Sequence, residues 1–127
     1  ILGNYKNNVR LFPRLLNKIV NKENIILDSN DGILINPIPV NNAADCIINS
    51  ISLNESNTIN VAGKEIISLR KIIEIFSKEV SIKPKIVVNK INNKNLVADI
   101  SKMENLLYPK FSNFNKCLTN FVKNNLK

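Results

Sequence analysis

The chain has 127 residues and a formal net charge of +8, with 44% hydrophobic residues, 6% aromatic residues and no tryptophan. This length fits one domain or one part of a larger protein. No apolar run approaches the roughly 20 residues of a membrane span, and no signal-peptide pattern is present, so we expect a cytoplasmic protein without a membrane partner. With no histidine and only two cysteines, Cys46 and Cys117, a disulfide framework and a metal site are not expected; both thiols are predicted to be buried in helices.

The positive charge is spread along the chain. Only three of the 18 basic residues are arginine, and the lysines are scattered. Arg10 and Arg14, one helical turn apart, form the one focused cationic spot. A diffuse basic surface favours anionic ligands such as phosphates. We therefore expect no nucleic-acid partner; nucleic-acid binding is a weaker alternative, which predicts a salt-sensitive affinity.

The first predicted elements are a helix and two short strands. Pro13 suits the first turn of a helix. Apolar residues recur there at helical spacing, namely Phe12, Leu15, Leu16, Ile19 and Val20. Residues 25–27 and 33–35 are short apolar runs separated by the turn sequence 28–32, which predicts two strands. Asp28 and Asp31 in this turn are expected to bond their own backbone rather than a cation.

A run with two prolines, residues 36–40, follows. Because proline fixes φ and lacks an N–H donor, this run is predicted to be an edge or crossover strand. Asn41 or Asn42 is a good N-cap for a helix over about 42–53. The buried face of this helix is predicted to consist of Ala44, Ile47, Ile48 and Ile51.

The second half continues to alternate strands with helices. Strands are predicted at 58–62 and 84–88, and a loop at 89–95. Ser68 is expected to cap a helix whose apolar face runs from Leu69 to Val80. Asp99 is expected to cap a short helix that Pro109 ends, and a last helix carries apolar residues from 114 to 122. The class is α/β, with short strands alternating with about five helices.

Several short motifs occur in a set order. They are NYKN at 4–7, LFP at 11–13, DG at 31–32 before NPIPVNNA at 36–43, INVAG at 59–63 before ISL at 67–69, and DISK at 99–102 before Pro109. Their order and spacing resemble the C-terminal part of the extended short-chain dehydrogenase/reductase family, the NAD-dependent nucleotide-sugar epimerases and dehydratases. The resemblance covers nearly the whole chain.

This resemblance implies a domain organisation, a ligand and a cofactor. Residues 1–127 would form a single substrate-binding subdomain, the C-terminal part of a Rossmann-type enzyme whose NAD-binding portion lies upstream of Ile1. The ligand would be a nucleoside-diphosphate sugar. The full-length protein would use NAD(P), which this chain alone would not bind. We also expect a homo-oligomer, since an isolated chain would expose apolar faces and the edge of the 58–62 strand.

The resemblance also implies a substrate-binding site. Its residues would be Asn8, Arg10, Phe12 and Arg14, with Asn36 opposite. The arginine with which the family contacts the diphosphate aligns near Ile35 or Asn36, so Arg10 or Arg14 would take over the charge pairing. Guanidinium matches phosphate oxygens bidentately. Phe12 would supply a stacking or packing surface.

The chain lacks the chemistry that moves hydride in this family. Gly3, Gly32 and Gly63 lie far apart, so no Gly-rich turn can receive a dinucleotide pyrophosphate. The Tyr-x-x-x-Lys pair is also absent, and no catalytic, cofactor-binding or metal-binding residue is assigned. The alternative is a non-catalytic binding or regulatory module of the same fold, which the altered motif at 36–42 favours.

Overall fold

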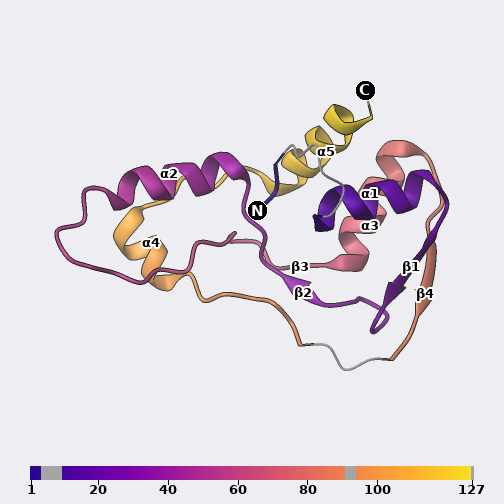
Figure 1. Ribbon diagram of the computed structural model, residues 1–127, viewed down its shortest axis with the longest axis horizontal. Helices are drawn as coiled ribbons and strands as arrows, with labels where there is room; N and C mark the ends of the chain where they lie inside the picture. Colours follow the sequence, from indigo (N-terminus) through magenta and orange to yellow (C-terminus); the bar gives the residue numbers. More distant parts are fainter. Residues whose placement is uncertain (4–9, 91–93, 127) are drawn as a thin grey trace.

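The computed structural model describes residues 1–3, 10–90 and 94–126, which fold into two lobes (Figure 1). The larger lobe holds three helices and one pair of strands, and the smaller lobe holds two helices. The larger lobe consists of α1 (Leu11–Val20), β1 (Asn24–Leu27), α3 (Leu69–Val80), β4 (Lys85–Val88) and α5 (Phe114–Asn125). The smaller lobe consists of α2 (Val40–Ser50) and α4 (Ser101–Leu107), and β2 (Leu34–Ile35) and β3 (Ile67–Ser68) lie between the lobes. The predicted α/β class with five helices and short strands is confirmed.

The larger lobe has an aliphatic core built around three phenylalanines. Phe76 stacks on Phe121 with ring centroids 5.6 Å apart, and Phe12 meets the two rings at 6.4 and 6.2 Å. These residues come from α3, α5 and α1, so the three helices share one core. Periodicity correctly predicted most of their apolar faces, because the three helices bury these stripes against one another. Val20, predicted in the stripe of α1, is 38% exposed instead.

The strands form two separate pairs. β1 runs parallel to β4, from Asn24 opposite Lys85 to Leu27 opposite Val88. β2 runs antiparallel to β3, with Leu34 opposite Ser68. The strands predicted at 25–27, 33–35 and 84–88 are therefore confirmed, yet the two that the 28–32 turn joins pair with different partners.

Helix α3 begins where the sequence predicts. Ser68 Oγ accepts a hydrogen bond from Lys71 N–H at 3.2 Å. The prediction that Asp99 caps α4 was wrong, because Ile100 is the N-cap; the Asp99 carboxylate lies one residue earlier and accepts from Ser101 N–H at 2.9 Å. Asn113 caps α5 through Lys116 N–H at 2.9 Å, a cap that we did not predict.

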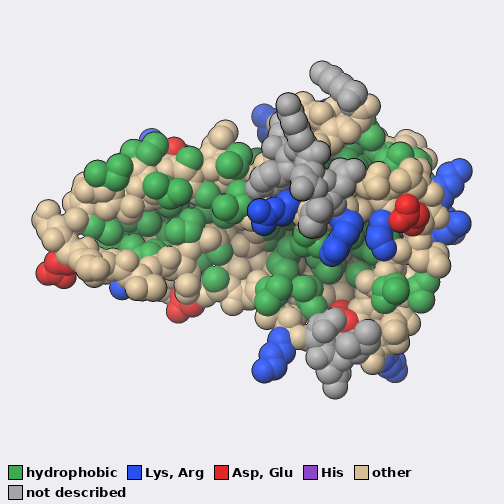
Figure 2. Space-filling model, in the orientation of Figure 1, with side chains coloured by type: hydrophobic (Ala, Val, Ile, Leu, Met, Phe, Trp, Pro, Cys, Tyr) green, Lys and Arg blue, Asp and Glu red, His purple; other side chains and the backbone are tan. Residues whose placement is uncertain are grey.

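The prediction for α2 was wrong in its cap and in its buried face. The helix begins at Val40 and Pro39 is its N-cap, so neither Asn41 nor Asn42 caps it. The buried residues are Asn42, Ala43 and Cys46, and Cys46 belongs to the smaller core. The predicted face is exposed instead, with Ile47 at 64%, Ile48 at 63% and Ile51 at 81% exposure. Figure 2 shows apolar side chains gathered over this lobe. The sequence shows an apolar stripe, but only the packing shows whether anything covers it.

The predicted strand at 58–62 is not formed. A strand requires a hydrogen-bonded neighbour, and no part of the chain that the structure describes pairs with this segment. Its side chains still anchor it: Ile59 packs on the smaller core, and Asn60 Nδ2 donates to the Asp99 carbonyl at 3.2 Å. Across residues 1–3, 10–90 and 94–126, no helix combines the length and the apolar character of a membrane span.

Candidate functional site

A hollow of about 440 Å³ lies where the N-terminus of α1 meets the end of β2. Three segments and the first residue of the chain line it, mostly with apolar side chains. The lining residues are Ile1, Arg10, Leu11, Phe12, Ile35, Asn36, Pro37 and Leu96. The hollow therefore gathers residues that lie far apart in the sequence.

Arg10 gives this hollow its positive charge. It is the N-cap residue of α1, and its side chain is exposed. The first turn of α1 carries no acidic side chain, and no ion pair involving Arg10 occurs within the described ranges. A helix N-terminus also carries a partial positive charge from its free N–H groups. Together, guanidinium and helix end favour an anionic group at this place.

The predicted site residues divide between the hollow and its surroundings. Arg10, Phe12 and Asn36 all line the hollow, although the last two are 24 positions apart in sequence. Arg14 is exposed on α1 and is not among the lining residues. Asn8 lies outside the described residues. Phe12 is only 4% exposed, and its ring contacts two other phenylalanines. Its side chain is therefore part of the hydrophobic core beneath the hollow and is not free to stack on a ligand.

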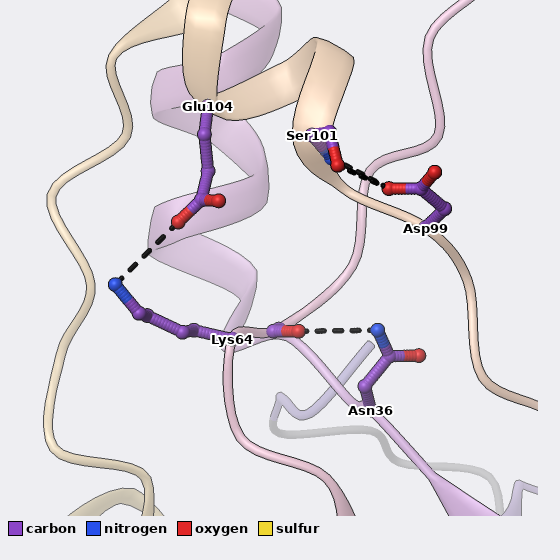
Figure 3. Close-up of polar contacts among 6 residues, drawn as sticks. Asn36, Lys64, Asp99, Ser101 and Glu104 are labelled. Carbon is purple, nitrogen blue, oxygen red and sulfur yellow. Dashed lines mark hydrogen bonds and ion pairs between the residues drawn. The ribbon is translucent and has the colours of Figure 1, made fainter.

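The Asn36 side chain is buried and fully engaged. Its Nδ2 donates to the carbonyls of Gly63 at 3.2 Å and Ala98 at 2.9 Å. Its Oδ1 accepts from Ala98 N–H at 2.9 Å. Figure 3 shows the amide nitrogen joined by a dashed line to the carbonyl oxygen next to Lys64, which is the bond to Gly63.

The Gly63 turn is tied to the smaller lobe as well. Lys64 Nζ lies 3.5 Å from Glu104 Oε1 and 5.8 Å from the centre of the Phe111 ring (Figure 3). Nearby, hydrogen bonds from the Ser101 hydroxyl and N–H hold the pKa of Asp99 below its ordinary value. Through the bond from Asn36 to Gly63, a lining residue of the hollow is thus linked to α4 and the smaller lobe.

The cysteines do not offer a nucleophile. Burial raises the pKa of the Cys46 thiol, and the Asp45 carboxylate adds to the effect. Burial likewise raises the pKa of Cys117. Both thiols are free. Cys46 is buried, as predicted, whereas Cys117, which was also predicted to be buried, is only half-buried. Within the described ranges, no group of acidic or thiol side chains could hold a metal ion. The charge of Arg10 and the N-terminus of α1 is suited to binding an anion.

Three solved structures show which fold this is. The chain superposes on UDP-glucuronic acid 4-epimerase from Bacillus cereus, bound to UDP-glucuronic acid and NAD, with a TM-score of 0.77, 17% identity and 96% of the chain covered. It matches dTDP-glucose 4,6-dehydratase from Bacillus anthracis, bound to NAD, with a TM-score of 0.77, 15% identity and 95% covered. It matches RMD from Pseudomonas aeruginosa, bound to NADPH, with a TM-score of 0.78, 12% identity and 98% covered.

The chain has the fold of the extended short-chain dehydrogenases/reductases. It corresponds to a C-terminal portion of that fold, and it spans 42%, 40% and 44% of the three chains. No family model matches the sequence, and no curated protein matches it. The fold resemblance seen in the short motifs is thus confirmed by the shape of the chain.

Sequence reasoning missed part of this hollow. Leu11, Pro37 and Leu96 line it, but apolar residues near a turn give no signal of a site. Sequence reasoning also missed that asparagine side chains, such as Asn36 and Asn42, bond backbone groups of distant segments. Asn42 donates to the Lys110 carbonyl at 2.6 Å and accepts from Ser112 N–H at 3.1 Å. Their partners lie about seventy residues away, which no local pattern reveals.

Proposed function

We propose that this chain is the substrate-binding portion of an NAD-dependent nucleotide-sugar epimerase or dehydratase. It binds a nucleoside-diphosphate sugar, with the diphosphate at Arg10 and the N-terminus of α1. The observation that carries the proposal is a cationic hollow in a fold whose solved examples hold nucleotide ligands. One of them holds UDP-glucuronic acid together with NAD, a second holds NAD, and a third holds NADPH. The protein works in a reducing cytoplasm, in keeping with its two unpaired cysteines.

The cofactor belongs to another part of the enzyme. This chain has no Gly-rich turn and no Tyr-x-x-x-Lys pair. A separate NAD-binding portion, upstream in the same protein, holds NAD(P) and supplies the groups that move hydride and protons. Residues 1–127 act as one subdomain that presents the nucleotide sugar to it. The exposed isoleucines of α2 and the unpaired segment 58–62 support this arrangement, since both are suited to packing against a further sheet.

Replacing Arg10 tests the proposed binding site. We expect Arg10→Ala to weaken UDP-glucuronic acid binding about tenfold or more, because a charge-assisted pair with the diphosphate is lost. The measurement is calorimetric titration of the protein that contains both portions, saturated with NAD. Arg14→Ala is the matched control, since it removes the same charge one turn further along α1. Equal losses for both variants would mean that the effect is general electrostatics, and no loss for Arg10→Ala would contradict the proposed site.

The second candidate is a non-catalytic binding or regulatory module of the same fold. Two observations favour it: Ile35 stands near the place of the family's diphosphate-binding arginine, and the Asn36 amide is engaged in the fold. The upstream residues decide between the two, because a Gly-rich turn and a Tyr-x-x-x-Lys pair there would indicate an enzyme.

A further inference from the structure

Just after β2 ends, the side chain of Asn36 bonds the backbone of Ala98 in the way that a neighbouring strand would. Its amide exchanges two bonds with Ala98, one to the N–H and one to the carbonyl, each 2.9 Å long. A third bond, 3.2 Å long, reaches the Gly63 carbonyl. A carboxamide has two N–H donors, and both are used here. Because the residue is 8% exposed, the amide serves the protein and has no donor left for a ligand.

The segment that Asn36 holds forms one wall of the hollow. Leu96 lies beside Ile35 in a parallel bridge, and its N–H donates to the Leu34 carbonyl at 2.9 Å. Asn95 Oδ1 accepts from Leu34 N–H at 2.9 Å. Leu96 and Val97 are 68% and 41% exposed, so apolar burial contributes little to holding them. Hydrogen bonds to β2 and to Asn36 are what position this wall.

We propose that Asn36 is a positioning residue for the ligand hollow. Its amide fixes residues 96–98 against the end of β2 and so sets where Leu96 lies in the wall that it shares with Arg10. It acts through Ala98 and does not contact the ligand. The identity of the ligand rests on the proposed nucleotide-sugar function.

Two asparagine-to-aspartate variants separate this role from a general effect of charge. Asn95→Asp keeps the oxygen that accepts from Leu34 N–H, so the bond survives. Asn36→Asp keeps an oxygen that can accept from Ala98 N–H, but it loses both donors and turns a carboxylate toward the Gly63 and Ala98 carbonyl oxygens. The repulsion between the carboxylate and the Ala98 carbonyl should push this segment away from Asn36 and so break the Ala98 N–H bond as well. In the ligand-free protein we expect the Ala98 amide to exchange hydrogen about tenfold faster in Asn36→Asp than in the wild type. In Asn95→Asp the exchange should stay close to that of the wild type.

The pH dependence of this exchange identifies the missing donor. Burial and the two carbonyl dipoles disfavour the charged form, so the pKa of the introduced carboxyl at position 36 is raised. Above that pKa the protection of Ala98 is lost; as pH falls through it, the protonated acid donates one bond and part of the protection returns. The protonated acid has nearly the same size as the carboxylate, so a role limited to filling space predicts no such recovery. In Asn95→Asp no recovery is expected.

The wild-type protein provides a measurement that needs no substitution. Both side-chain amide protons of Asn36 should exchange more slowly with solvent than those of the exposed Asn95, because each is held in a hydrogen bond. Equally fast exchange at the two side chains would overturn the proposal, even if the Asn36 variants fail to fold.

Binding completes the test. We expect UDP-glucuronic acid to bind about tenfold more weakly to Asn36→Asp than to the wild type at neutral pH, with recovery at lower pH and no change in Asn95→Asp. Weaker binding with unchanged Ala98 exchange would indicate a direct ligand contact and overturn the proposal. Faster exchange with unchanged affinity would also overturn it. A wild-type protein that binds no nucleotide sugar would refute the proposed function instead, and the ligand-free exchange would still decide whether Asn36 holds the wall.

Discussion

Asparagine side chains join segments of this protein that its backbone leaves apart. Asn49 Nδ2 donates to the Leu107 carbonyl at 2.9 Å, which links α2 to α4. Asn42 links α2 to the connection before α5, and Asn36 and Asn60 hold the segment around Ala98 and Asp99. A carboxamide both donates and accepts, so it can satisfy an unpaired peptide group where no strand is available. These bonds explain how a chain with few ladder pairs keeps its connections in place.

Gly63 is required at its position because there is no room for a side chain. A Cβ atom there would collide with the Pro37 carbonyl oxygen, and that carbonyl belongs to the backbone. The Gly63 N–H donates to the Asn36 carbonyl at 2.9 Å, so the turn cannot shift without losing this bond. We expect Gly63→Ala to lower the free energy of unfolding by about 2 kcal/mol, as for other overpacked sites.

Urea denaturation measures the effect of Gly63→Ala, and Lys64→Ala is its neighbouring control. Lys64 is 67% exposed in its ion pair with Glu104, so its replacement should cost at most about 1 kcal/mol. Similar midpoints for the wild type and Gly63→Ala would show that the turn adjusts freely.

Helix α2 has two different faces. One face buries Ala43 and Cys46, and Cys46 belongs to the smaller core. The other presents Ile47, Ile48 and Ile51 to solvent, at the spacing of a buried stripe. A hollow of about 280 Å³ next to this stripe is lined partly by Ile47 and Val61, which extends the apolar surface toward segment 58–62. Under the proposed function, we propose that this face contacts the NAD-binding portion.

Charge placed on the α2 stripe should weaken self-association through this face. We expect residues 1–127 alone to self-associate, and the double change Ile47→Lys with Ile48→Lys to raise the dissociation constant at least about tenfold, because a buried isoleucine contributes about 1.5–3 kcal/mol. Sedimentation velocity over a range of concentrations measures it. Asn41→Lys adds a positive charge to an exposed position of the same helix and should leave the distribution unchanged. A wild-type chain that stays monomeric at all concentrations would refute the expected self-association.

The two lobes have cores of very different size. The larger core contains most of the buried side chains, including the phenylalanines of α1, α3 and α5. The smaller core has Cys46, Met103 and Leu107 at its centre, with partly buried residues around them. Since hydrophobic stabilisation follows buried apolar area, the smaller lobe contributes little stability of its own. It depends on its hydrogen bonds and on whatever covers α2.

A substitution in the larger core should therefore destabilise a larger part of the protein than a substitution in the smaller core. Phe76→Ala is expected to cost about 3–5 kcal/mol and to accelerate amide exchange throughout the larger lobe. Met103→Ala should accelerate exchange mainly in α2 and α4. Hydrogen exchange followed by mass spectrometry distinguishes the two patterns. If Met103→Ala exposes α3 and α5 equally, then the lobes unfold as one unit.

Local pattern was enough to predict much of this protein. The apolar stripes of α1, α3 and α5 face one another, so periodicity correctly predicted most of their buried sides. The Ser68 cap depends on a neighbour three residues away, and the motif order indicated the fold. All of these features depend on residues close in sequence or on their order along the chain.

Other features were decided only when the chain folded. The pairing of β1 with β4, the exposed side of α2 and the missing strand at 58–62 depend on segments far away in sequence or on a partner surface. The roles of Asn36 and Asn42 depend on carbonyls 62 and 68 residues away. The sequence gives the chemistry of each side chain. Which groups a side chain contacts is decided by long-range packing, and that packing formed the hollow around Arg10.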